Sequence, residues 1–201
     1  MKALVVYYSR TGTTKILGEA IAKGLGAEAE ELIDQKKRLG LRPFRWLIAG
    51  MDARRKKLTS IKVQKPPQDY DLILIGTPIW ASRMTPAVRT YLESQNLEGK
   101  KVGLFCTGGN GDRERYFDEL KLMVPKSTLV GTLGVRTLDV RSGAYVEKLR
   151  IFLRGFGVEL PPPLPPAPAP TAITPVQTPS TQVQPPANET TTSGPDTQTN
   201  P

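Results

Sequence analysis

Short apolar runs without polar interruption constrain the fold of this chain more than any other feature. Three of them, residues 3–8, 72–75 and 102–106, are each followed by a loop rich in Gly, Thr or Ser. An apolar run that does not alternate with polar residues fits a strand buried on both faces, which is typical of a parallel sheet. Residues 29–33 and 129–135 are weaker strand candidates. The runs thus favour a parallel sheet, with two further candidate strands.

Helical patterns lie between these runs. Thr85 followed by Pro86 is typical of a helix start, and Ser142 is a candidate cap for a helix that ends near Gly157. Alternating strands and helices predict an α/β protein, a three-layer sandwich with right-handed crossovers.

Composition excludes several classes of chemistry. The chain has no His and one Cys, so we expect no metal site, no histidine-based catalysis and no internal disulfide. No apolar stretch approaches the roughly 20 residues that span a bilayer, and the N-terminus does not resemble a signal peptide. We therefore expect a soluble, cytoplasmic protein.

The composition changes abruptly near residue 160. Residues 161–201 hold 13 of the 19 prolines and no Lys, Arg or aromatic residue. Such a segment buries too little apolar surface to offset its ordering entropy. The sequence therefore predicts one domain over residues 1–159 and a disordered Pro/Thr-rich tail over residues 160–201, which could alternatively bind a proline-recognising domain.

A polar loop follows the first strand and precedes the first helix. It carries four hydroxyl groups, one cation and one glycine, in the order Ser9, Arg10, Thr11, Gly12, Thr13, Thr14. Backbone N–H groups at a helix N-terminus together with hydroxyls can hold a phosphate group. An ordinary polar turn is the alternative.

Two further loops follow the next two apolar strands. One contains Thr77, Pro78, Ile79, Trp80 and Ala81, where the indole could either stack on a planar ring or pack over the following helix. The other contains Thr107, Gly108, Gly109, Asn110 and Gly111, whose glycines allow close approach of the backbone to a ligand. In open α/β sheets, ligands bind beyond the carboxyl ends of the strands, where these loops lie.

The segments YYSRTGTTKILGEAIA, DLILIGTPIWASRMTPAVRTYL and KVGLFCTGGNGDRERYFDEL, in this order, resemble the flavodoxin-like family of FMN proteins. The resemblance covers roughly residues 1–157. It implies a five-stranded parallel sheet in the order 2-1-3-4-5, with FMN at the edge formed by the three loops. It further implies that the loop of residues 9–14 holds the FMN phosphate. Residues 77–81 would border the flavin ring, with Trp80 stacked on it, and the backbone of residues 107–111 would line the other side of the ring.

A basic insertion, residues 34–69, occupies the place of a crossover helix. Residues 34–65 hold eleven Lys or Arg against two Asp. The insertion could be an amphipathic helix that packs on the sheet with solvated charges. It could also form a homodimer contact, bind an acidic redox protein, or lie on an anionic membrane surface. We expect no nucleic acid partner, because no groove-reading module is visible.

The resemblance leads to a functional expectation. FMN supplies the redox chemistry, so no side chain is predicted to be a catalytic acid or base. Electron-shuttle flavodoxins are commonly acidic and carry a Tyr in the third loop, whereas this chain is basic and has none there before Tyr116. We therefore expect an oxidoreductase that takes electrons from NAD(P)H or a protein donor and passes them to a quinone or other acceptor. The alternatives are a non-enzymatic electron carrier for a protein partner, and a scaffold that has lost FMN.

Overall fold

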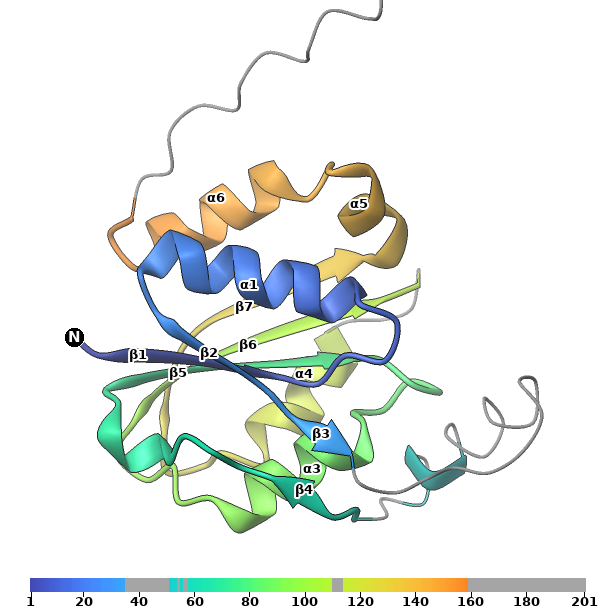
Figure 1. The fold of residues 1–201 in the computed structure, drawn as a ribbon, viewed down its shortest axis with the longest axis vertical. Helices are drawn as coiled ribbons and strands as arrows, with labels where there is room; N and C mark the ends of the chain where they lie inside the picture. The colour runs from blue at the N-terminus through green and yellow to red at the C-terminus, as the bar shows by residue number, and fades with distance from the viewer. Residues whose placement is uncertain (35–50, 54, 56–57, 110–113, 159–201) are drawn as a thin grey trace, which may run out of the picture. The chain divides into compact units, whose positions relative to one another are not determined.

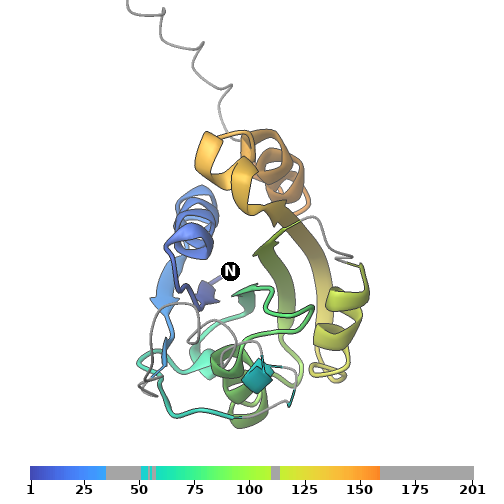
Figure 2. The ribbon, with the colours of Figure 1, turned by 90° about the vertical axis from the view of Figure 1, so that its right-hand side faces the viewer.

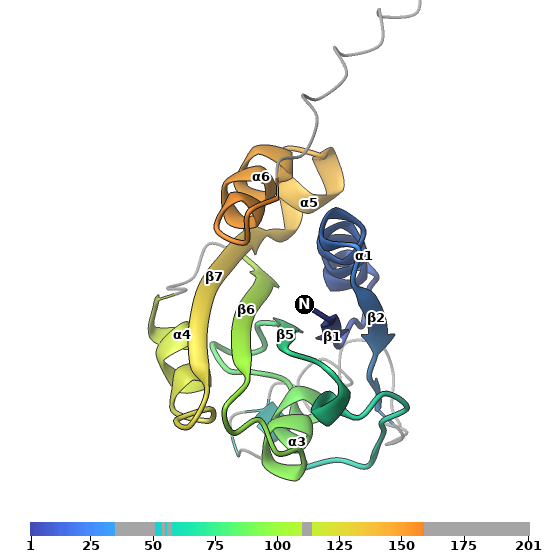
Figure 3. The same ribbon diagram turned by 90° about the vertical axis from the view of Figure 1, so that its left-hand side faces the viewer.

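The computed structural model describes residues 1–34, 51–53, 55, 58–109 and 114–158 of the 201-residue chain. Within them, β1 (Ala3–Tyr7), β2 (Glu28–Glu31), β5 (Leu72–Pro78), β6 (Lys101–Gly108) and β7 (Thr128–Arg136) form one sheet. All neighbouring pairs are parallel, in the order β2-β1-β5-β6-β7, and Figure 3 shows the strands side by side in this order. Numbered within this sheet, the order is 2-1-3-4-5, so the predicted topology is confirmed.

Helices cover both faces of the sheet (Figure 1). Helices α1 (Thr13–Leu25), α5 (Thr137–Ser142) and α6 (Val146–Arg154) lie on one face. Helices α3 (Pro86–Ser94) and α4 (Glu114–Lys121) lie on the other. The molecule is therefore the three-layer α/β sandwich that the alternation of elements predicts.

Each face of the sheet has its own apolar core, because consecutive strand residues point to opposite faces. From β1, Val5 and Tyr7 pack with Leu17 of α1 on one side. Leu4 and Val6 pack with the α3 and α4 side chains on the other. All five residues of β1 are buried, which explains why its sequence shows no alternation.

The C-terminal helical region differs from the sequence prediction. Ser142 does not cap a helix; it ends α5, and its hydroxyl donates to the carbonyl oxygen of Asp139. Gly143 follows with a φ of 81° and interrupts the helical path. Helix α6 begins only at Val146, so two helices occupy the place of one.

The insertion leaves and rejoins the sandwich through a small antiparallel sheet. Strand β3 (Ile33–Asp34) pairs with β4 (Ile61–Lys62), and a short 3-10 helix, η1 (Pro67–Asp69), leads into β5. Thr59 fixes the returning chain, because its backbone N–H donates to the Thr90 hydroxyl of α3. Residues 35–50, 54 and 56–57 of the insertion, which is predicted to be an amphipathic helix, lie outside the described residues, as do residues 159–201.

No helix among the described residues is long and apolar enough to cross a membrane.

Candidate functional site

A pocket of about 180 Å³ lies at the carboxyl edge of the sheet, the edge that faces the viewer in Figure 2. Residues of all three predicted loops line it. The first loop contributes Arg10, Thr11, Thr13 and Thr14; the second contributes Pro78, Ile79 and Trp80; the third contributes Thr107, Gly108 and Gly109.

The first loop leads directly into helix α1. Gly12 occupies the N-cap position with a φ of 84°, which glycine adopts without steric cost. It forms no side-chain cap, and a Cβ placed there would meet no atom within 4 Å. The N–H groups of the first helical turn therefore have no side-chain cap as a hydrogen-bond acceptor. The neighbouring Ser9 hydroxyl is buried without a hydrogen-bond partner.

Hydrogen bonds join the three loops below the pocket. The hydroxyls of Thr14 and Thr107, both almost fully buried, share a hydrogen bond with an O···O distance of 2.7 Å. The backbone N–H of Ile79 donates to the carbonyl oxygen of Thr107, with an N···O distance of 2.8 Å. Thr107 thus connects the third loop to both others, and the pocket walls are held in fixed positions.

A tight turn presents Trp80 to the pocket. Trp80 and Arg83 exchange both backbone hydrogen bonds, each with an N···O distance of 2.9 Å. Ala81 and Ser82, between them, have φ values of 48° and 61°. This left-handed region is uncommon for residues with a Cβ, so the turn carries backbone strain at the edge of the site.

Thr77, predicted to border a ring, is instead fully buried beneath the second loop. Its hydroxyl oxygen accepts from the backbone N–H of Thr85 at 3.3 Å and lies 3.2 Å from the Thr85 hydroxyl. Thr85 is the N-cap of α3, but its side chain makes no cap hydrogen bond. The pair ties the start of α3 to the end of β5.

Buried charges support the turn that carries Trp80. The Arg89 guanidinium, from α3, is 2.6 Å from a carboxylate oxygen of Glu119 on α4. The other oxygen of Glu119 is 3.3 Å from the guanidinium of Arg83, which closes the turn. The side chains of Arg89 and Glu119 are 5% and 13% exposed, so this ion pair is shielded from solvent. The Trp80 turn is therefore anchored to both helices of that face.

Trp80 is enclosed by aromatic and cationic side chains. Its ring meets Tyr8 edge to face with centroids 5.7 Å apart, and the Arg10 guanidinium lies 5.2 Å from its centroid. The side chain is 4% exposed. Stacking of a flavin on this face of Trp80 would therefore require Arg10 to move.

Four of the predicted site residues do not line the pocket. Ser9 lies just outside it, Gly12 forms the helix N-cap, Thr77 lies underneath, and Ala81 points outward in the turn. Asn110 and Gly111 lie outside the described residues.

Sequence reasoning missed two lining residues, Thr137 and Arg141 of α5. No glycine-rich or hydroxyl-rich loop marks this region. The available signal was position: α5 directly follows β7, the fifth strand, so it starts at the same sheet edge as the three loops.

The pocket lining is cationic. Among its described residues are two arginines, Arg10 and Arg141, and no Asp or Glu. Asp139 of α5 is compensated elsewhere: Arg136 approaches it to 2.6 Å and Lys148 to 3.3 Å. Hydrogen bonding from Arg136 is the main cause that lowers the pKa of Asp139 below its usual value. The net positive lining favours an anionic ligand.

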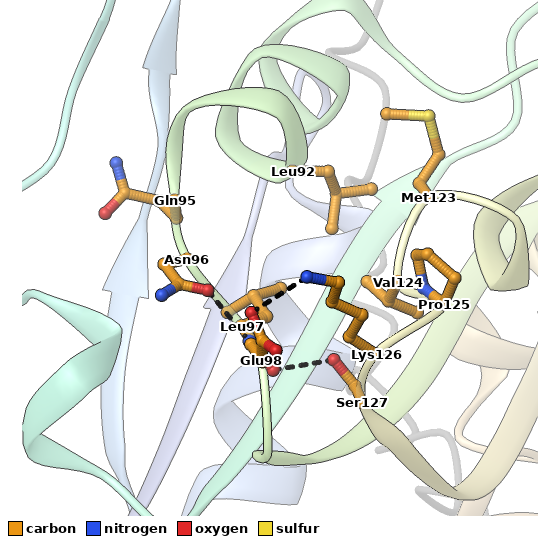
Figure 4. A pocket seen from close by; sticks show the side chains of 10 residues that line it. All are labelled: Leu92, Gln95, Asn96, Leu97, Glu98, Met123, Val124, Pro125, Lys126 and Ser127. Carbon is orange, nitrogen blue, oxygen red and sulfur yellow. Dashed lines mark hydrogen bonds and ion pairs between the residues drawn. The ribbon is translucent and has the colours of Figure 1, made fainter.

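A second pocket, of about 160 Å³, lies between the loops that precede β6 and β7, at the opposite edge of the sheet (Figure 4). Its polar groups pair with one another. Lys126 forms an ion pair with Glu98 at 3.2 Å, and the Ser127 hydroxyl donates to the carbonyl oxygen of Leu97. These contacts join the two loops and serve the packing of the fold.

The arrangement at the carboxyl edge fits a phosphate-bearing planar cofactor at its phosphate end. An uncapped N-terminus of a 13-residue helix, buried threonine hydroxyls and the unpartnered Ser9 hydroxyl are donors suited to a phosphate group. The whole pocket, at about 180 Å³, is smaller than the roughly 300–1,000 Å³ usual for ligand pockets. Entry of a planar ring therefore requires Arg10 to leave Trp80. Fold and site together describe an α/β sandwich with a positively charged pocket at the carboxyl edge of its parallel sheet.

Comparison with known proteins identifies the family. A model of the flavodoxin family matches residues 2–136, so the chain belongs to the flavodoxin family. This is a family of FMN-binding flavoproteins, and FMN is the cofactor that membership implies.

Solved structures share the fold. The chain is similar to a Lactobacillus acidophilus flavoprotein in complex with FMN, at 24% identity and a TM-score of 0.59 over 74% of this chain and 97% of that one. It is equally similar to a candidate flavoprotein of Bacteroides uniformis, at 24% identity and a TM-score of 0.59 over 71% of this chain and 97% of that one. At this identity the likeness establishes the fold.

Proposed function

We propose that this protein is an FMN-dependent oxidoreductase, which takes electrons from NAD(P)H or a protein donor and passes them to a quinone or another small acceptor. The pocket of residues from three strand ends, built on an uncapped helix N-terminus, is the observation that carries this proposal. Family membership supports FMN as its occupant. When bound, FMN supplies hydride and electron transfer.

The chain's own groups would bind and orient the cofactor. The N–H groups that open α1 and the hydroxyls of Thr11 and Thr13 would hold the phosphate. Gly108 and Gly109 also line the pocket, and a Cβ at Gly109 would meet no atom within 4 Å. This part of the lining leaves space for a planar ring to approach the backbone.

The cationic lining favours an enzyme that meets an anionic small-molecule donor. Arg10, which leaves Trp80 when a ring enters, would attract the phosphates of a nicotinamide dinucleotide, and no described lining carboxylate opposes it. A carrier that meets only a large protein partner gains less from charges inside the pocket than from charges on the surrounding surface.

Anaerobic mixing of the FMN-loaded protein with NADH or NADPH tests the proposal. We expect the visible flavin absorption to bleach directly and to return when a quinone is added, with repeated turnover under steady-state conditions. A mixture of free FMN with the same donor is the control for uncatalysed reduction. If the loaded protein stays oxidised until a separate flavoprotein reductase is supplied, it is a carrier and the proposed reaction is wrong.

A further inference from the structure

We propose that Arg141 of α5 binds the phosphate group of FMN, an inference that rests on the proposed function. It assigns a cofactor-binding role to a helix that lies outside the three loops. Arg141 lines the same pocket as Thr11, Thr13 and Thr14, so this residue and the phosphate loop border one space. Figure 1 shows α5 beside the N-terminal end of α1, where that loop enters the helix.

The phosphate loop, residues 9–14, offers mainly neutral hydrogen-bond donors to a phosphate group. A phosphate monoester carries a charge near −2, and neutral N–H and hydroxyl donors stabilise it less than charged donors do. The loop has one cation, Arg10, whose guanidinium lies over the Trp80 ring, at the end of the pocket where the flavin ring would enter. The other donors of the loop are neutral hydroxyls and backbone N–H groups, so a second cation would supply charge that they lack.

Arg141 has the properties that this role demands. It is exposed to solvent, and no ion pair among the described residues includes it. Asp139, the nearest acidic residue along α5, is held by Arg136 through bonds from Nε and a terminal nitrogen, and also by Lys148. The Asp139 carboxylate is thereby drawn to other cations, and the guanidinium of Arg141 is left for a ligand. A planar guanidinium matches two phosphate oxygens at once.

The order of strands in the sheet places α5 next to the pocket. Strand β7 pairs with β6, and Arg136 at the end of β7 lies beside Gly108 of the third loop. The chain enters α5 immediately afterwards, and α5 packs against α1. Arg141 therefore follows the fifth strand of the sheet, β7, whereas the phosphate loop follows the first strand, β1, and both line one pocket.

Comparing FMN with riboflavin, which lacks the phosphate, tests this assignment. Each flavin is titrated with the full-length protein, and binding is followed by quenching of flavin fluorescence. For Arg141→Gln we expect the FMN dissociation constant to rise about tenfold to a hundredfold, the range for loss of a charged hydrogen bond. The riboflavin dissociation constant should change less than about twofold. Arg141→Lys should lose less FMN affinity than Arg141→Gln, because it keeps the charge.

Arg154→Gln is the matched control. Arg154 also lies in the last turn of a helix on this face and is exposed, but it does not line the pocket. This variant removes the same charge, so a general electrostatic effect would weaken FMN binding equally in both variants and would overturn the assignment.

Other outcomes separate the inference from the proposed function. If Arg141→Gln weakens FMN and riboflavin binding alike, Arg141 acts on the ring, and the phosphate assignment is wrong. If it changes neither affinity while the wild-type protein binds FMN, the inference fails and the cofactor proposal stands. If the wild-type protein binds neither flavin, the proposed function itself fails.

Discussion

Replacing Thr14 by Val tests whether the buried hydroxyl pair holds the first and third loops together. Thr14 and Thr107 are 1% and 2% exposed, and their hydroxyl oxygens are 2.7 Å apart. Valine keeps the shape of the side chain but leaves the Thr107 hydroxyl buried without this partner. Such a loss costs about 1–3 kcal/mol, so we expect the free energy of unfolding to fall by about 1.5 kcal/mol.

The double variant gives the sharper result. Thr107→Val alone should cost a similar amount, but Thr14→Val with Thr107→Val replaces both polar groups by apolar ones of equal shape. That exchange can be nearly neutral, so the double variant should cost at least about 1 kcal/mol less than the sum of the two single changes.

Urea unfolding of the FMN-free protein, followed by far-ultraviolet circular dichroism, measures these free energies. With a slope of about 2 kcal/mol per molar urea, each single change should lower the midpoint by about 0.7 M. Thr13→Val is the control, because Thr13 is also buried at the start of α1 but has no side-chain hydrogen bond among the described residues. Additive costs, or single variants as stable as the wild type, would refute the reasoning.

Three further predictions concern packing, turn strain and alkaline stability. Gly76→Ala should destabilise the fold by about 2 kcal/mol in the same urea assay, because a Cβ there would overlap the ring of Phe105. Phe105→Leu should recover part of the loss. Replacing Ala81 by Asn and Ser82 by Gly should raise the melting temperature, since these residues accept left-handed φ values at lower cost; an unchanged or lower value would argue against strain in the turn. Burial raises the pKa of Tyr7 to about 12. Because this folded-state pKa exceeds the unfolded value of about 10, the stability that the neutral Tyr7 side chain contributes is complete below pH ~10 and is lost as the pH rises toward 12. Measuring the free energy of unfolding at a series of alkaline pH values tests this.

The sheet was predictable because its signals are local. A strand buried on both faces needs an unbroken apolar run, and β1, β5 and β6 each have one. The loops at the carboxyl ends carry hydroxyls, glycine and Trp80 within a few residues of a strand. Their meeting in one pocket then follows from parallel strand order, which the family resemblance implied and the topology confirms.

The remaining parts of the site depend on contacts between distant segments. Arg141 reaches the pocket only because β7 pairs with β6 and α5 packs on α1, and no local pattern reports that placement. The position of Arg10 over Trp80 joins residues 70 positions apart in the chain. The family resemblance implies a flavin ring stacked on Trp80, which stays a prediction; in this structure Arg10 and Tyr8 lie against that side chain.

The basic insertion shows another limit. Its anchors, β3, β4 and Thr59, are described, but most of its charged residues lie outside the described ranges. A homodimer contact, an acidic redox partner and an anionic membrane surface therefore stay predictions for this segment.

Titration of the purified, flavin-free protein with FMN tests the central claim most directly. The account predicts that one equivalent of FMN is taken up at micromolar concentration, with quenched flavin fluorescence, a shifted visible spectrum and a higher melting temperature, because a ligand that binds only the folded state stabilises it. Unchanged flavin fluorescence and an unchanged melting temperature in the presence of excess FMN would contradict the claim that the pocket between the three strand-end loops is a flavin site.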